Sequence, residues 1–142
     1  MTEPITLEPR NIREIWDDIK PGLEELRAEW PKLGTWRVED VYAEVIAEHA
    51  VLYDTEDGFA ICTLKIDPYT QDRDFYIWIA YAYDDRRGGI LTKYLPSFIE
   101  AAKDYGCTKV TTASNHPALA KMEGLEPRYT MYGVEINGID TS

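Results

Sequence analysis

The stretch Tyr83-Asp84-Asp85-Arg86-Arg87-Gly88-Gly89-Ile90-Leu91 joins an apolar run typical of a buried strand to a run typical of a helix. Arginines and paired glycines at such a turn can present several backbone N–H groups to an anion, and the following helix adds the positive end of its dipole. Because the chain has a net charge of −11, a turn suited to a phosphate contrasts with the rest of it. The stretch therefore predicts an anion-binding turn. The alternative is a glycine-rich turn whose arginines only neutralise Asp84 and Asp85.

The segments around this turn predict a βαβ unit. Residues 75–83 are too apolar and aromatic for an edge strand and indicate a central one. Residues 90–105 have helical periodicity, Gly106 suits the position after a helix end, and Pro96 predicts a kink or a later start. The apolar stripe of this helix consists of Leu91, Tyr94, Leu95, Phe98, Ile99 and Ala102. Residues 108–113 indicate a second strand, which should run parallel to the first with a right-handed crossover.

The N-terminal third of the chain is predicted to be mainly helical. Asn11 can cap a helix whose apolar residues recur at helical spacing until Pro21, which we expect to end it. A second short helix is expected at 23–30. The clearest helix is at 38–48, where an apolar stripe lies opposite acidic residues.

The remaining elements complete a mixed α/β (α+β) fold. They are a first strand at 5–7, a hairpin of strands at 50–53 and 59–66 with a turn at Glu56-Asp57-Gly58, a short helix at 117–122 and a last strand at 129–136. The hairpin should be antiparallel, so the central sheet should be mixed and mostly antiparallel, with helices flanking it. We find no repeat or linker and expect a single domain spanning residues 1–142.

The charge of the chain is distributed unevenly. Residues 1–58 carry 15 acids and 6 bases, a net of −9, whereas residues 59–142 carry 11 acids and 9 bases, a net of −2. The overall charge argues against direct binding to nucleic acid or to an anionic membrane. The acidic N-terminal part would attract a cationic substrate or partner. Its alternative is a solvated surface without a specific role. The aromatic residues of this part would either wall an acceptor pocket or pack as ordinary core residues; they are Trp30, Trp36, Tyr42 and Tyr53.

The cysteines and histidines do not indicate a metal site or a disulfide. Cys62 and Cys107 lie in apolar runs and are expected to be buried free thiols. His49 and His116 lack metal-ligand spacing. The N-terminus lacks a signal-peptide pattern and no apolar run approaches the length of a membrane span. These features predict a soluble, cytoplasmic protein.

The order of elements, together with the Arg-Arg-Gly-Gly turn, resembles the GNAT superfamily of acyl-CoA-dependent N-acyltransferases. The family loop follows Arg/Gln-x-x-Gly-x-Gly/Ala, and Arg86-x-x-Gly89-x-Leu91 fits two of its three positions. The family also tends to have an Asn after its fifth strand and a Gly-Phe at the end of the following short helix. This chain has Ser114-Asn115 and Met122-Glu123-Gly124-Leu125 at these places, with Leu125 in place of Phe. The resemblance extends from residue 5 to residue 136 and implies acetyl-CoA as co-substrate, an amine as acceptor and no metal.

The resemblance also implies a set of coenzyme-binding residues. Backbone N–H groups near Tyr81 or Ala82 would face the thioester carbonyl as oxyanion-type donors. Asn115 would contact the pantetheine arm, or else cap the last helix. The complete set is Tyr81, Ala82, Tyr83, Arg86, Arg87, Gly88, Gly89, Ile90, Leu91 and Asn115.

The catalytic acid and base are less clearly indicated. Many family members have a tyrosine four residues before the later Gly, where this chain has Ala120. Tyr129 and Tyr132 are the replacements to consider, and on one strand they should point to opposite faces. Asp84 is the first candidate for the base, with Asp74, Glu44 or a water relay as alternatives.

Two non-enzymatic functions stay open. The sequence around residues 76–81 and 129–132 also resembles small GNAT-like proteins of tailed bacteriophages, whose coenzyme loops are often degenerate. Such a protein would act in the host cytoplasm by binding a host or virion protein. Homodimer formation stays open for the enzymatic and the non-enzymatic functions alike. A third hypothesis is an acidic DNA mimic, which the net charge of −11 suggests.

Overall fold

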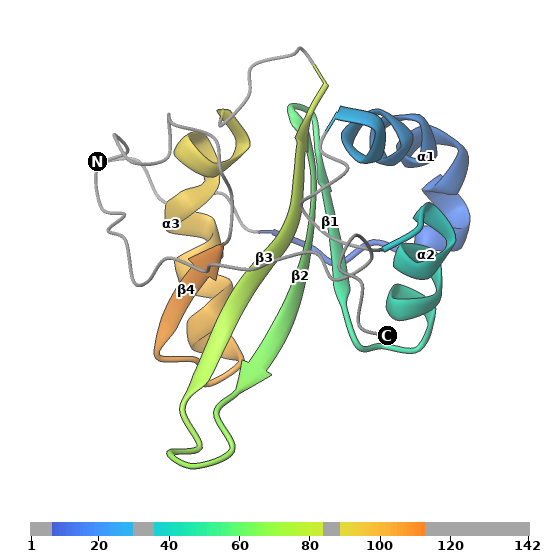
Figure 1. Cartoon of the computed structure of the whole chain (residues 1–142). Helices are drawn as coiled ribbons and strands as arrows, with labels where there is room; N and C mark the ends of the chain where they lie inside the picture. Colours follow the sequence, from blue (N-terminus) through green and yellow to red (C-terminus); the bar gives the residue numbers. More distant parts are fainter. Residues whose placement is uncertain (1–6, 30–35, 84–88, 113–142) are drawn as a thin grey trace, which may run out of the picture.

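The computed structural model describes residues 7–29, 36–83 and 89–112 (Figure 1). Its elements are α1 (Ile12–Glu29), α2 (Val38–Ile46), β1 (Val51–Thr55), β2 (Gly58–Ile66), β3 (Arg73–Ala82), α3 (Gly89–Asp104) and β4 (Lys109–Thr112). The sheet has the order β1-β2-β3-β4, with antiparallel β1–β2 and β2–β3 pairs and a parallel β3–β4 pair. The predicted mixed α/β fold, its hairpin and its βαβ unit are thus confirmed. The helix predicted at 117–122 and the strand at 129–136 lie outside the described residues.

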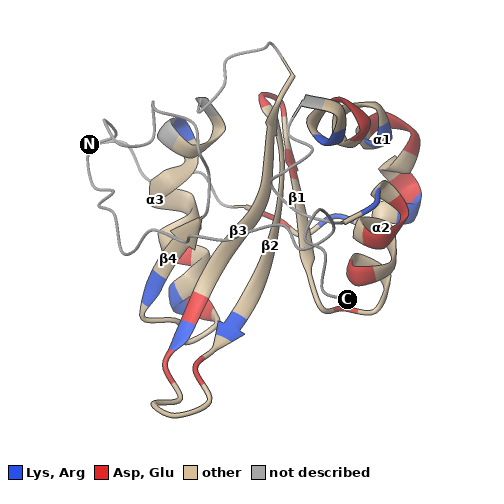
Figure 2. Cartoon of the chain, viewed as in Figure 1, with Lys and Arg blue, Asp and Glu red and all other residues tan. Residues whose placement is uncertain are grey.

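Helices cover both faces of the sheet. Helices α1 and α2 lie on one face and α3 on the other (Figure 1). Each face has its own buried cluster, one built with Ile19, Leu23 and Val41, the other with Tyr94 and Phe98. Acidic residues follow the outer surfaces of α1 and α2 (Figure 2). None of the described helices combines the length and the apolar character that a membrane crossing requires.

A β-bulge in β3 decides which side chains reach each face. Ile61 pairs with Ile79 but Cys62 pairs with Ile77, so Trp78 is the extra residue. A bulge of this kind bends the strand and shifts the alternation of its side chains. Before the bulge, Ile77 packs in the α3 cluster; after it, Ile79 packs in the α1–α2 cluster. Beyond Trp78, odd-numbered residues of β3 therefore face α1.

Helix α1 is continuous through Pro21, so the predicted break at this proline was wrong. A proline inside a helix costs about 3 kcal/mol because it removes one hydrogen bond and crowds the preceding turn. Ile19 and Leu23, on either side of the proline, are fully buried. Full burial of each such side chain contributes roughly 1.5–3 kcal/mol. Packing against the sheet thus offsets the local penalty.

Helix α3 follows the prediction closely. It begins at Gly89 and also continues through its proline, Pro96. Of the predicted stripe, Leu91, Tyr94, Phe98 and Ala102 are buried, whereas Ile99 is 39% exposed. Gly106 has a φ of 72° after the helix end, as its predicted role requires. The free thiol of Cys62 is buried, as expected, and that of Cys107 is partly exposed.

Replacing Gly22 tests the packing of α1 on the end of β3. A Cβ at this position would lie 2.9 Å from the ring of Tyr81 and 3.1 Å from the ring of Phe59. We expect Gly22→Ala to lower the free energy of unfolding by about 1–3 kcal/mol, as overpacking does, although alanine favours helix by roughly 1 kcal/mol. Denaturant titration measures the change. In a Tyr81→Ala background the same substitution should become neutral or stabilising, and stabilisation in the wild-type background would contradict this packing.

Candidate coenzyme and acceptor site

The turn between β1 and β2 brings the end of β3 and the start of α3 together. The Tyr83 N–H donates to the backbone carbonyl of Asp57 at 3.0 Å. The Asp57 carboxylate accepts hydrogen bonds from Lys93 Nζ and from the Tyr94 hydroxyl, each at 2.7 Å. One residue thus contacts the segments on both sides of residues 84–88.

Gly58, the next residue, permits a close approach of three elements. A Cβ at Gly58 would lie 2.0 Å from the carbonyl oxygen of Tyr81 and 2.8 Å from Ile90 Cδ1. Backbone cannot yield to a contact of this length, so only glycine fits. The first residue of β2 therefore packs directly against the end of β3 and the first turn of α3.

The start of α3 is electrostatically suited to an anion. Its first turn carries no acidic residue, whereas those of α1 and α2 carry Glu14 and the pair Glu39 and Asp40. Because no acidic side chain lies in this first turn, none there offsets the partial positive charge of the helix end. The hydrogen bond to Asp57 raises the pKa of Lys93, one turn further on, so this side chain stays protonated at neutral pH.

The predicted coenzyme residues occupy this junction as far as the structure describes them. Tyr81 and Ala82 end β3 and Tyr83 follows it, and Gly89, Ile90 and Leu91 begin α3. Leu91, which replaces a small residue of the family loop, is 8% exposed and packs in the α3 cluster. Arg86, Arg87, Gly88 and Asn115 lie outside the described residues, as do Asp84, Tyr129 and Tyr132.

Strand β3 extends well beyond its parallel ladder with β4. Within the described residues this ladder runs from the pair Asp74↔Lys109 to Ile77↔Thr112. At its end the Thr112 hydroxyl donates to the carbonyl of Ile77 at 3.0 Å. The bulge at Trp78 follows, and β3 continues to Ala82. The predicted oxyanion donors at Tyr81 and Ala82 lie on this continuation.

The face of β3 toward α1 carries two tyrosine–carboxylate pairs. The Tyr81 hydroxyl donates to Glu25 Oε2 of α1 at 2.6 Å, and the Tyr83 hydroxyl donates to Asp54 Oδ1 of β1 at 2.5 Å. The ring of Phe59 lies 5.4 Å from that of Tyr81 and 6.1 Å from that of Tyr83. Burial, then the bond to Asp54, raises the pKa of Tyr83, so its phenol stays protonated. An aromatic surface edged by carboxylates can receive an organic cation.

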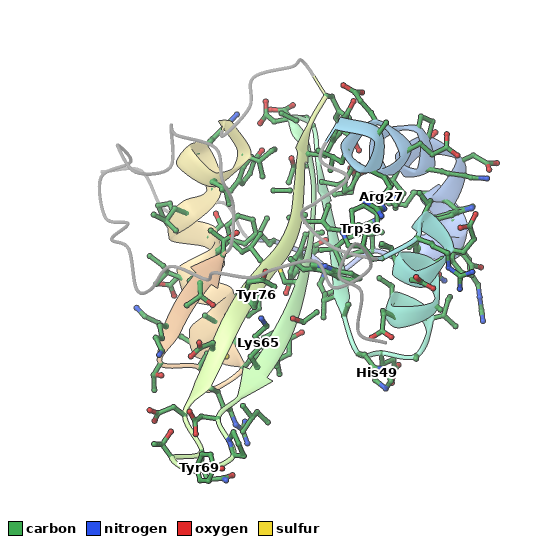
Figure 3. The ribbon with its side chains drawn as sticks, in the orientation of Figure 1. Arg27, Trp36, His49, Lys65, Tyr69 and Tyr76 are labelled. Atoms are coloured by element: carbon green, nitrogen blue, oxygen red, sulfur yellow. The ribbon has the colours of Figure 1, made fainter. Side chains whose placement is uncertain are left out.

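The alternative bases that the sequence suggested lie elsewhere. Asp74 forms an ion pair with Lys109 at 3.5 Å near the start of β3, the opposite end of the strand from Ala82. Glu44 of α2 contacts His49 at 3.3 Å, and His49 lies below α2 in Figure 3. The structure thus brings neither carboxylate to the junction of β3 and α3.

The aromatic residues considered for an acceptor pocket do not gather in one place. Trp36 packs edge-on against Trp78 at 6.2 Å on the α1–α2 side, beneath Arg27 (Figure 3). Tyr42 packs against α1, whereas Tyr53 is buried in the α3 cluster. Trp30 lies outside the described residues. Their packing is that of ordinary core residues, the other interpretation that the sequence allowed.

Sequence reasoning missed five residues of this site: Glu25, Asp54, Asp57, Lys93 and Tyr94. The motif Glu56-Asp57-Gly58 indicated a turn, but no local pattern indicated that it would meet the start of α3. Glu25 and Asp54 were counted only within the general acidity of the N-terminal part. Among the described residues no group of three His, Cys, Asp or Glu side chains is placed to hold a metal ion.

Comparisons with known proteins show the fold of the chain. No protein-family model and no curated protein sequence matches the chain. Among solved structures, a predicted acetyltransferase from Clostridium acetobutylicum with acetyl-CoA superposes with a TM-score of 0.67 at 14% identity, over 92% of this chain and 96% of that chain.

Two further structures superpose over similar lengths. A ribosomal-protein-alanine N-acetyltransferase from Brucella melitensis has a TM-score of 0.64 at 15% identity, over 92% of this chain and 99% of its own. A glucosamine-6-phosphate N-acetyltransferase from Arabidopsis thaliana has a TM-score of 0.62 at 13% identity, over 93% and 98%. The chain therefore has the fold of the GNAT acetyltransferases, as the sequence resemblance implied.

Proposed function

We propose that this protein is an acyl-CoA-dependent N-acyltransferase that transfers an acetyl group from acetyl-CoA to a primary amine of a cationic small molecule or protein. The observation that carries the proposal is the junction of the bulged β3 with the acid-free start of α3, in a GNAT fold. This junction joins a helix end that suits an anion to a strand end whose tyrosines are hydrogen-bonded to the carboxylates of Glu25 and Asp54.

The coenzyme would lie along the end of β3 and the start of α3. Backbone N–H groups of Gly88 and Gly89 would meet the pyrophosphate, and Arg86 and Arg87 would add charge-assisted hydrogen bonds. An N–H group near Tyr81, Ala82 or Tyr83 would polarise the thioester carbonyl. Asn115 would contact the pantetheine arm.

Transfer then needs two proton movements. A bound ammonium group gives one proton to a base and becomes a neutral amine, which attacks the thioester carbon as the C–S bond breaks. The second amine proton ends on the departing sulfur. We assign the base to Asp84 and the donor to the thiolate to Tyr129 or Tyr132. The net products are the amide, coenzyme A and one proton released to solvent.

The acceptor would approach over the α1 face of β3. Glu25 and Asp54 provide negative charge there, and Tyr81 and Tyr83 provide the aromatic surface. Arg10 lies 3.9 Å from Asp54 and neutralises part of this charge. The acidic outer surface of α1 continues the same potential, which would steer a cation toward the site (Figure 2).

Coenzyme binding is tested by titrating acetyl-CoA calorimetrically into the wild type and into Arg86→Glu/Gly89→Asp. The wild type should bind with a micromolar dissociation constant, and the double variant should bind at least about ten-fold more weakly because it places two carboxylates at the anion site. Lys103→Glu, at the other end of α3, is the charge-reversal control and should bind as the wild type does. A wild type that binds no acyl-CoA would contradict the proposal and favour a GNAT-like module that acts by binding a protein.

The acceptor surface is tested with spermidine as the probe amine and coenzyme A release as the readout. Glu25→Gln and Asp54→Asn should each raise the KM for spermidine about three- to five-fold, the effect of losing up to ~1 kcal/mol of exposed charge attraction. The dissociation constant for acetyl-CoA should stay unchanged. Glu24→Gln, one residue away on the outer side of α1, is the control. An unaltered KM in both variants would place the acceptor elsewhere.

A further inference from the structure

We propose that Asp57 is a positioning residue for the coenzyme: it holds the end of β3 and the start of α3 at the separation that the anion site requires. The inference rests on the proposed function for the identity of the ligand. Its physical basis is that one side chain and its own backbone carbonyl together contact both segments. The carbonyl accepts from the Tyr83 N–H, and the carboxylate accepts from Lys93 and Tyr94.

Asp57 is itself held in place by the turn that carries it. The Thr55 hydroxyl oxygen accepts the N–H groups of Asp57 and Gly58, each at 3.2 Å, and its hydroxyl donates to the carbonyl of Gly58 at 2.9 Å. Gly58 in turn lies against the Tyr81 carbonyl and Ile90. The turn therefore fixes the position of Asp57 relative to the sheet. The hydrogen bonds from Lys93 and Tyr94 to the Asp57 carboxylate then fix the position of α3 relative to the turn.

The contact with Tyr94 distinguishes Asp57 from an ordinary surface ion pair. Exposed ion pairs contribute little because water screens them and both side chains are mobile. Tyr94, by contrast, is 2% exposed and its ring belongs to the buried α3 cluster. Its hydroxyl therefore holds the carboxylate of Asp57 from a fixed point in the core.

The same geometry fixes a positive charge beside the anion site. Lys93 is half exposed, yet its Nζ lies 2.7 Å from the Asp57 carboxylate. The carboxylate balances the charge of the lysine, so the pair acts by fixing the position of Lys93 in the second turn of α3 rather than by adding net positive charge. Loss of Asp57 would release both this charge and the helix start. Because small displacements of binding groups are costly in preorganised sites, we expect the loss to appear in coenzyme affinity.

The test compares four variants of the full chain: Asp57→Ala, Tyr94→Phe, their combination, and Glu56→Ala as the neighbouring control on the same turn. The dissociation constants for acetyl-CoA are measured by calorimetry at a temperature well below the thermal unfolding midpoint of each variant. The midpoints are measured in a separate thermal denaturation experiment. Asp57→Ala should weaken binding about ten-fold or more, and Tyr94→Phe by a smaller factor. The combination should be no weaker than Asp57→Ala alone, because both substitutions remove the same contact. Glu56→Ala should bind as the wild type does.

Hydrogen exchange without coenzyme gives a second readout that does not depend on the proposed function. Asp57→Ala should accelerate exchange in a peptide covering 89–98 and leave one covering 38–46 unchanged. Unchanged exchange at the start of α3, or wild-type affinity in Asp57→Ala, would overturn the inference. A wild type that binds no acetyl-CoA would refute the proposed function, whereas the exchange comparison would still decide whether Asp57 holds α3.

Discussion

The bulge at Trp78 is the constraint on which the architecture of the site depends. Without the extra residue, Ile79 and Tyr81 would lie on the same face of β3 as Phe75 and Ile77, under α3. With it, they pack against α1, and the α3 side of the strand end is left to Ala80 and Ala82. A single inserted residue thus separates a face with small side chains, next to the start of α3, from a face with tyrosines and carboxylates.

In the proposed acyltransferase, this separation would give the coenzyme and the amine acceptor different surfaces. The start of α3 has positive potential and suits phosphates, whereas the α1 face of β3 has negative potential and suits a cation. Both meet where β3 ends. The net charge of −11 is therefore compatible with the proposed anion site, because α1 and α2 carry nine of the 26 acidic residues whereas the first turn of α3 has none.

The sequence predicted those features that depend on local periodicity. Three local patterns each predicted one part of the fold: the apolar run at 75–83 a central strand, the apolar stripe at 90–105 a helix, and the turn at Gly58 a hairpin. Together these parts predicted the mixed sheet and its βαβ unit. The predicted helix end at Pro21 was wrong because the sequence shows only the local cost of a proline in a helix. The burial of Ile19 and Leu23, which offsets this cost, depends on packing against the sheet.

The residues around the site were harder to predict because their contacts join distant segments. Asp57 and Tyr94 are far apart in the chain, and neither carries a motif that indicates the other. The bulge at Trp78 was equally hidden, since one extra residue in an apolar run leaves the composition of a strand unchanged. The Arg86-x-x-Gly89 motif predicts a coenzyme site only in combination with the order of the surrounding elements, which matches a known fold.

The most direct test of the central claim is to map where acetyl-CoA protects the backbone amides of the full chain from hydrogen exchange. The account predicts protection at the end of β3 and in the first turns of α3, over about residues 78–94, with none in α2 at Val38–Ile46. Protection absent from this junction, or located instead on α2, would contradict it.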